Sequence, residues 1–303
     1  MPTVQDPSLQ TPLISTHNPT NKLNLYRIFN VFTVLTFFFS NAYSIVFARP
    51  SIVDISDKYP TYFTPSLIFI GIFWFILYIL QFGFVFYAQL NDLHIVQEVV
   101  EGVVGWWFSI INLFMCGWLF FWLRENFVLS EIFILLTLIS TSIAQHKLIA
   151  EYIPNHELVP DSVISFIHIP FSMFSAFSWL AVFYNGFIIL SQYGYESVEI
   201  AIGLAWFLAI LGTFWCITGV FTKGKRDFIF SFTMVWSLLG IGVRQTEKSL
   251  YITCDVLAIT LLLMIFFTIL KNSSNLIRNR PVDNERQQLL QHQINFLWRN
   301  YRG

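Results

Sequence analysis

Amide and aromatic side chains inside apolar stretches are the residues of this sequence best suited to bind a ligand. Trp118 and Trp122 follow Asn112 in one apolar run, and Trp74 and Tyr78 lie in an earlier run. Each pair of rings is spaced i to i+4, which places both rings on one face of a helix. An amide that faces lipid has no hydrogen-bond partner, so Asn112 is expected to face other helices.

Later apolar runs add further polar groups between aromatic rings. One contains Pro170-Phe171-Ser172 and Asn185, and another contains Trp236. In a ligand site, the rings would stack on an apolar molecule, and the amide and hydroxyl groups would orient its polar edge. The same groups also serve as hydrogen bonds and packing between helices, and the sequence leaves both interpretations open. The candidate ligand-binding residues are Trp74, Tyr78, Asn112, Trp118, Trp122, Phe171, Ser172, Asn185 and Trp236.

Ionisable side chains are scarce in the apolar runs. Glu98, Glu101, Arg244 and Asp255 are expected near the ends of these runs. Ion and proton pathways usually use charged groups deep in the membrane. The sequence therefore disfavours a proton- or sodium-coupled carrier.

Catalytic and metal-binding patterns are weak. Of the six histidines, only His168 directly precedes an apolar run, and Cys116, Cys216 and Cys254 have no metal-ligand spacing. The cysteines are interpreted as small apolar core residues. There is no Gly-x-Ser-x-Gly elbow and no phosphate-binding glycine loop. We expect neither an enzyme nor a resident metal or cofactor.

The amino-acid composition indicates the surroundings of the helices that position these side chains. Apolar residues make up 55% of the 303 residues and charged residues only 12%, with a mean hydropathy of +0.62. Soluble domains carry about 25% charged residues. The net charge of −1 and the absence of a basic stripe argue against a nucleic-acid partner. The chain is expected to be an all-α polytopic membrane protein with lipid as its surroundings.

Eight apolar segments are long enough to cross a bilayer, which takes about 20 residues per helix. The seventh is the shortest, so seven spans is the alternative. Residues 1–24 are expected to form a disordered polar tail, residues 25–271 one transmembrane bundle, and residues 272–303 a second polar tail. The expected spans are 28–46, 65–87, 103–123, 129–149, 163–190, 198–221, 228–243 and 251–270.

Positive charges give the expected orientation. With eight spans, twelve of the 17 Lys and Arg residues fall on the face that carries both tails. Lys and Arg are enriched on the cytosolic side of membrane proteins. Both termini are therefore predicted to be cytosolic.

Four short stretches, in a fixed order, carry a family likeness. They are Asp57–Pro65 followed by Trp74 and Tyr78; Asn112 through Trp118 and Trp122 to Ser130; Pro170-Phe171-Ser172 with Ala181 and Asn185; and Val235-Trp236-Ser237-Leu238-Leu239-Gly240-Ile241.

Together these stretches resemble the TspO/MBR (tryptophan-rich sensory protein) superfamily, in particular its longer TspO-like branch. The resemblance implies a TspO-like helical core with about three additional helices and a pocket for a porphyrin-like or sterol-like ligand. A tetrapyrrole would then be a ligand rather than a cofactor. Phe177 stands where the family pattern has Trp, and Trp179 follows it.

The C-terminal tail suggests sorting and partner functions. Glu285, Leu289 and Leu290 fit an acidic dileucine signal, which would direct the protein to endosomal or vacuolar membranes. The expected partners are membrane lipid and a hydrophobic small molecule that is bound, sensed or transported, and self-association is left open. The alternatives are a scaffold that acts through its cytosolic tail and a membrane enzyme that acts on lipid or tetrapyrrole.

Overall fold

The computed structural model describes residues 25–90, 94–152, 163–217 and 226–278, and these form helices with no strand among them. The predicted all-α fold is confirmed. The helices are α1 (Leu25–Val46), α2 (Ile52–Lys58), α3 (Leu67–Leu90), α4 (His94–Glu98), η1 (Val99–Val104), α5 (Trp107–Trp122), α6 (Phe127–His146), η2 (Lys147–Tyr152), η4 (Ile164–His168), α8 (Ile169–Gln192), α9 (Val198–Ile217), α10 (Phe228–Arg244) and α11 (Lys248–Arg278); the η segments are π-helical.

Each predicted span contains a helix, although the details differ. Six helices are long and apolar enough to cross a membrane, and a bent pair makes a seventh. This pair, Val96–Val104 with Trp107–Trp122, bends by 51° at a break where Gly105 has a φ of +48°. The predicted span 103–123 is therefore broken near its start, because only glycine adopts such a φ readily. Helix α10, which corresponds to the seventh predicted span, is apolar but only 17 residues long.

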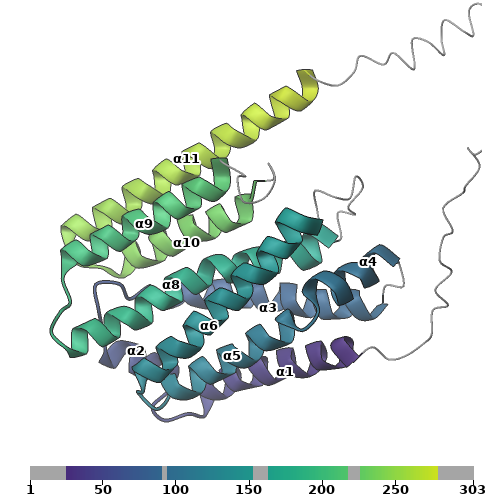
Figure 1. The fold of residues 1–303 in the computed structure, drawn as a ribbon. Coiled ribbons are helices and arrows are strands. Elements are labelled where there is room, and N and C mark those ends of the chain that lie inside the picture. The colour runs from purple at the N-terminus through teal and green to yellow at the C-terminus, as the bar shows by residue number, and fades with distance from the viewer. Residues whose placement is uncertain (1–24, 91–93, 153–162, 218–225, 279–303) are drawn as a thin grey trace, which may run out of the picture.

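The helices form two groups that lie side by side (Figure 1). One group contains α1, α3, α5, α6 and α8, and the other contains α9, α10 and α11. Helix α10 packs against α8 and joins the groups. The bundle therefore consists of a five-helix group and a three-helix layer.

At one end of the bundle, the segments that follow α1, α5, α8 and α10 contact one another through polar side chains. Lys58 binds Glu125 at 2.6 Å, and Arg244 binds Asp57 at 2.7 Å. The backbone N–H of Tyr62 donates to Glu196 at 2.6 Å. The start of α1 and the end of α11 lie together at the opposite end (Figure 1). The chain therefore passes along the bundle an even number of times.

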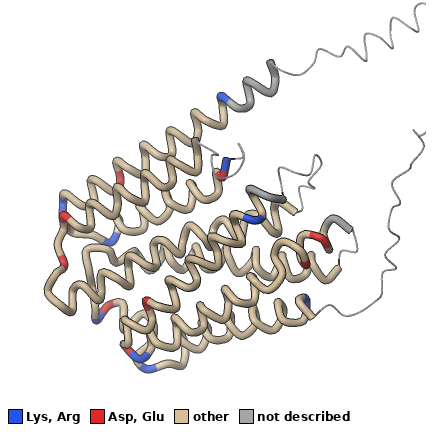
Figure 2. Tube along the Cα trace, in the orientation of Figure 1, with Lys and Arg blue, Asp and Glu red and all other residues tan. Residues whose placement is uncertain are grey.

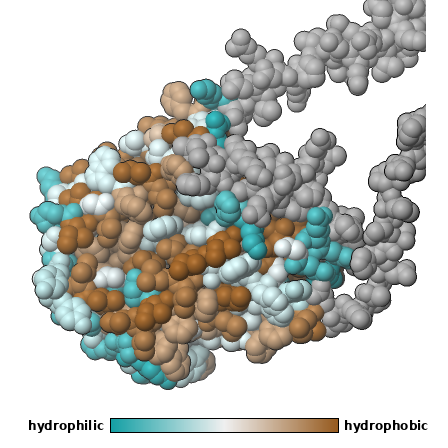
Figure 3. Space-filling model, viewed as in Figure 1, coloured by the Kyte–Doolittle hydropathy of each residue, from teal (hydrophilic) through white to brown (hydrophobic). Residues whose placement is uncertain are grey.

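The surface matches a membrane setting. Lys, Arg, Asp and Glu lie mainly at the two ends of the bundle (Figure 2). Apolar side chains dominate the face between the ends (Figure 3). Phe75 is 66% exposed and Phe267 is 72% exposed, which would be unfavourable in water. Lipid is the solvent that suits this surface.

Close packing of α5 on α6 depends on Gly117. A Cβ at this position would overlap the ring of Phe133 on α6. Small residues let transmembrane helices approach closely where burial from water provides no driving force.

We expect Gly117→Ala to lower the stability of the bundle by about 1–3 kcal/mol, because the rigid Phe133 ring cannot yield without repacking. Thermal unfolding of the detergent-purified protein measures the change. Gly203→Ala on α9 is the matched control, since nothing lies within 4 Å of the added Cβ. Equal melting temperatures for the two variants would contradict the packing argument.

The number of crossings can be measured with single cysteines in a chain whose native cysteines are replaced. If α10 crosses the membrane, Tyr195→Cys and Glu247→Cys react with an impermeant maleimide from one side, and Lys271→Cys reacts from the other. These three positions are exposed. Reaction of Glu247→Cys and Lys271→Cys from opposite sides, with Tyr195→Cys on the side of Lys271, would instead establish seven crossings.

Candidate functional site

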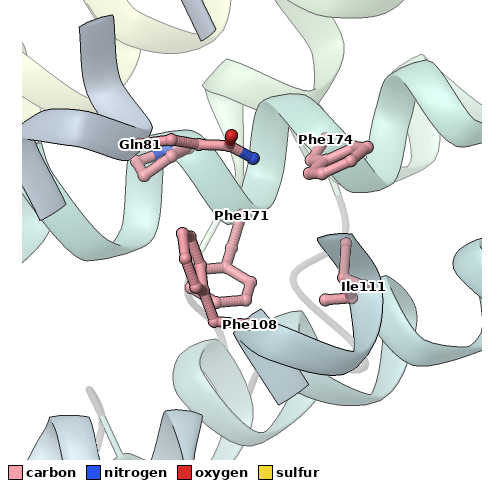
Figure 4. Close-up of a pocket in the computed structure, with 6 residues that line it drawn as sticks. Gln81, Phe108, Ile111, Phe171 and Phe174 are labelled. Carbon is pink, nitrogen blue, oxygen red and sulfur yellow. The ribbon is translucent and has the colours of Figure 1, made fainter. Parts of the chain in front are cut away.

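A small cavity lies between α3, α5 and α8. Its volume is about 10 Å³, which is room for about one water molecule. In Figure 4, the amide group of Gln81 points into the space that the surrounding rings enclose. Helices α5 and α8 contribute residues from their first turns, so the cavity lies towards the end where α1 begins. The lining residues are Gln81, Phe108, Ile111, Pro170, Phe171 and Phe174.

An amide bridge joins α3 to α5 beside this cavity. Asn112 is fully buried, and its side chain donates to the carbonyl of Phe108 at 3.0 Å. The Gln81 amide nitrogen donates to Asn112 Oδ1 at 3.5 Å. Gln81 Oε1 is buried and has no hydrogen-bond partner among the described residues. The predicted inward orientation of Asn112 is confirmed, and its partner is a residue that the sequence analysis did not select.

An aromatic cluster continues from the cavity towards α1. The Trp74 ring lies 5.9 Å from Phe174 and 5.1 Å from Phe177. Phe177, at the position where the family pattern has Trp, stacks on Phe73 at 4.3 Å. Tyr78 packs on Phe37 and Phe38, and its buried hydroxyl has no hydrogen-bond partner among the described residues.

The tryptophan pair on α5 lies at the other end of the helix. Trp118 and Trp122 have ring centroids 5.3 Å apart, as expected for one helical face. Trp122 packs on Phe127 and Tyr184 rather than on the cavity residues. Both indole Nε1 atoms are buried and have no hydrogen-bond partner among the described residues. This pair forms a separate aromatic site.

Asn185 joins α8 to α6. Its side-chain nitrogen donates to the Phe127 carbonyl at 2.9 Å and to Glu131 Oε2 at 2.8 Å. Asn185 is fully buried. Its role in the structure is a hydrogen bond between helices, which is one of the two interpretations that the sequence left open.

Ser172 and Trp236 lie apart from the cavity. Ser172 donates to Asp227 Oδ2 at 2.6 Å. The Trp236 indole donates to the Phe69 carbonyl at 3.0 Å and so ties α10 to α3. Of the nine predicted residues, Phe171 lines the cavity, Asn112 and Trp74 contact residues that line it, and Tyr78 packs on Trp74. The nine residues do not share one pocket, because sequence spacing places a residue on a helical face but does not determine which helix it meets.

Three polar residues were missed. Gln81 and Glu131 lie inside predicted spans, and their polar type in an apolar run was the available signal. Asp227 directly precedes α10, where its side chain accepts the Phe230 N–H as an N-cap. Ionisable side chains were expected to be scarce in the apolar runs; Asp227 lies just outside these runs and is nevertheless fully buried.

The cysteines lie within the described residues, whereas the sorting signal does not. Among the described residues, no group of three His, Cys, Asp or Glu side chains is placed to hold a metal ion. The cysteines at positions 116, 216 and 254 are free thiols that are buried or half-buried. Glu285, Leu289 and Leu290 lie outside the described residues.

Asn185→Leu should destabilise the protein by about 1–3 kcal/mol, because it leaves the Phe127 carbonyl and Glu131 without their donor. Unfolding of the purified protein measures the effect. Asn41→Leu is the control, since Asn41 donates only to the Phe37 carbonyl of its own helix. A loss no larger than that of the control would show that the bond between α6 and α8 is dispensable.

Comparison with known proteins gives one match. Residues 27–267 match the family described as TSPO-like protein, and the match covers all eight predicted spans in part or in full. No curated protein and no solved structure matches the chain.

Proposed function

The chain belongs to the TSPO-like protein family, and on this premise we propose that it binds a hydrophobic small molecule between α3, α5 and α8. It is an integral, multi-pass membrane protein, as the family and its apolar helices indicate. The ligand would be largely apolar and flat, with a few polar groups, as in porphyrin-like or sterol-like molecules. The function proposed is binding, sensing or transport rather than catalysis.

The observation that carries the proposal is a pair of unpaired polar atoms on one face of α3. Tyr78 and Gln81 are spaced i to i+3, so they are neighbours on the helix surface. The Tyr78 hydroxyl and Gln81 Oε1 are both buried without a partner among the described residues. A buried polar atom without a hydrogen bond costs about 1–3 kcal/mol. A ligand that supplies a hydroxyl or N–H group to Gln81 would recover that energy.

The surroundings of these atoms suit an apolar ring system. The rings of Trp74, Phe171 and Phe174 flank the cavity and its extension towards α1. Offset and edge-to-face contacts between aromatic groups are favourable by about 0.5–1.5 kcal/mol beyond burial. Asn112 would hold the Gln81 amide in position from α5.

The cavity in the structure is too small for such a ligand. Sites for drug-sized ligands are typically about 300–1,000 Å³, whereas the cavity here is about 10 Å³. Binding therefore requires that α3 moves away from α8. Helix α3 suits this movement, because aromatic rings pack it on α1 and α8, as Trp74 on Phe37 and Phe73 on Phe177 do, and because only 28% of its span is buried. Entry would then be lateral, from the membrane.

The orientation and location of the protein are part of the same proposal. The end of the bundle that carries Arg27, Lys147, Arg226 and Lys271 would face the cytosol by the positive-inside rule. The cavity would then lie in the cytosolic half of the membrane. Delivery to endosomal or vacuolar membranes through Glu285, Leu289 and Leu290 stays a prediction.

Titration of the purified full-length protein in nanodiscs tests the binding proposal. Protoporphyrin, haem and a panel of sterols would be added while tryptophan fluorescence and, for sterols, binding of labelled ligand are followed. We expect saturable binding of at least one of these ligands. Gln81→Leu should weaken that binding about tenfold, because a tenfold change in affinity corresponds to about 1.4 kcal/mol, the size of one lost hydrogen bond.

Phe75→Leu is the matched control, since Phe75 lies on the same helix and faces outward. It should leave the affinity unchanged. Titrations that stay flat for every ligand in the wild type would overturn the proposal. Equal weakening by Gln81→Leu and Phe75→Leu would place the ligand on the outer surface of α3 instead.

A further inference from the structure

Asp227 is a fully buried carboxylate at the junction of four helices. Its Oδ1 accepts the Phe230 N–H at 3.0 Å, which caps the start of α10. Its Oδ2 accepts Ser172 Oγ at 2.6 Å and Gln145 Nε2 at 2.7 Å, from α8 and α6. Its backbone N–H donates to the Trp215 carbonyl on α9 at 3.1 Å. The carboxylate thus ties both helix groups together.

His168 lies directly beside this carboxylate. Its Nε2 lies 3.5 Å from Asp227 Oδ2, and the His168 side chain is 12% exposed. Taking an isolated carboxylate out of water is costly unless a nearby positive charge compensates it. Whether Asp227 has this compensation depends on the charge of His168.

One nitrogen of His168 is free to take up a proton. Nε2 faces Asp227, whereas Nδ1 is buried and has no hydrogen-bond partner among the described residues. In neutral imidazole one ring nitrogen carries a hydrogen, and in the imidazolium both do. With Nε2–H directed at the carboxylate, a proton from water binds at Nδ1 and converts His168 to the cation, and its release reverses the step.

Asp227 itself stays charged over the range in which histidines titrate. Burial raises the pKa of Asp227, but His168, Ser172 and the Phe230 N–H together lower it, so the pKa lies below its ordinary value. The contribution of its charge to stability is fully present above the ordinary pKa of an aspartate and is lost as the pH falls through the lowered pKa. If His168 loses its proton, Asp227 still keeps three hydrogen-bond donors.

Other ionisable groups near the pair do not replace His168. His146, the last residue of α6, is exposed, and Lys147, the first residue of η2, is half-buried beside the Trp107 ring. Arg226, next to Asp227, donates to the Ile217 carbonyl at 3.4 Å. Helix α9 brings Cys216, and α3 brings Tyr87, which stacks on Phe166 of η4. Among the described residues, the ion-pair contact given for Asp227 is the one with His168.

We propose that His168 and Asp227 form a proton-binding site, at which proton uptake on His168 Nδ1 tightens the docking of α10 on α8. The site lies at the end of the bundle where α1 begins, and it joins the five-helix group to the three-helix layer. It is independent of the ligand cavity proposed above, which no residue of this cluster lines.

Hydrogen–deuterium exchange of the full-length protein tests the proposal at the first two turns of α10. After correction for the intrinsic exchange rate, protection of these amides should be about tenfold higher at about pH 5.5 than at about pH 8.5, two values on either side of the range in which histidine side chains generally change charge. His168→Gln should give low protection that no longer depends on pH. Asp227→Asn should also remove the pH dependence, because it removes the charge and keeps an acceptor.

His146→Gln is the matched control, since this exposed histidine lies on a neighbouring helix at the same end. It should keep the wild-type pH dependence. Protection that does not change with pH in the wild type, or a pH dependence that survives in His168→Gln, would overturn the proposal. If the two site variants do not fold, nitrogen-15 NMR of the histidines in the wild-type protein still tests the proposal. Protonation of His168 must then occur over the same pH interval as the change in protection.

Discussion

The hydrocarbon interior of a membrane offers no water to hydrogen-bond, and the structure of this protein depends on that constraint. Backbone groups must be satisfied within helices, and polar side chains must find partners inside the bundle. Hydroxyl side chains solve the problem locally: Thr137 donates to the Phe133 carbonyl, Ser178 to that of Phe174 and Ser237 to that of Thr233, each one turn back. Amides solve it between helices, as Asn112 and Asn185 do. The polar atoms that remain unpaired are therefore informative, because each represents an energy that the fold has not recovered.

The two ends of the bundle differ in how they are held. At one end, Asp57 and Lys58 of the short helix α2 bind charged residues of two other connections, and the Lys58 ammonium and Tyr59 hydroxyl hold the pKa of Glu125 below its ordinary value. Single exposed ion pairs of this kind contribute only about 0–1 kcal/mol each. Several of them together still fix the relative positions of the loops. At this end, regular helices are joined by connections that bind one another through their side chains.

The opposite end contains the irregular features. The helix break at Gly105 and the π-helical segments η1, η2 and η4 all lie there, as do the cavity and the Asp227 cluster. π-Helical turns occur frequently at functional sites, because they shift side chains out of the regular helical register. The η4 turn ends at His168, directly before the α8 residues that line the cavity and bind Asp227. Ligand binding and proton binding, as proposed, would both act at the end that is less regular, while the other end holds the bundle together.

The sequence by itself determined the fold class, the positions of the helices and the family, because apolar length and the order of aromatic motifs are properties of the chain alone. It also determined that Asn112 faces inward, since an amide cannot face lipid without loss. It did not determine which residues meet. Phe171 and Ser172 are adjacent in sequence, yet one lines the cavity and the other binds Asp227, because neighbours on a helix point about 100° apart. Trp118 and Trp236 looked equally suited to a ligand, but they pack against Trp122 and Phe69. Only the packing of helices distant in sequence decided that Gln81 lies at the cavity and that a carboxylate outside every predicted span is buried beside His168.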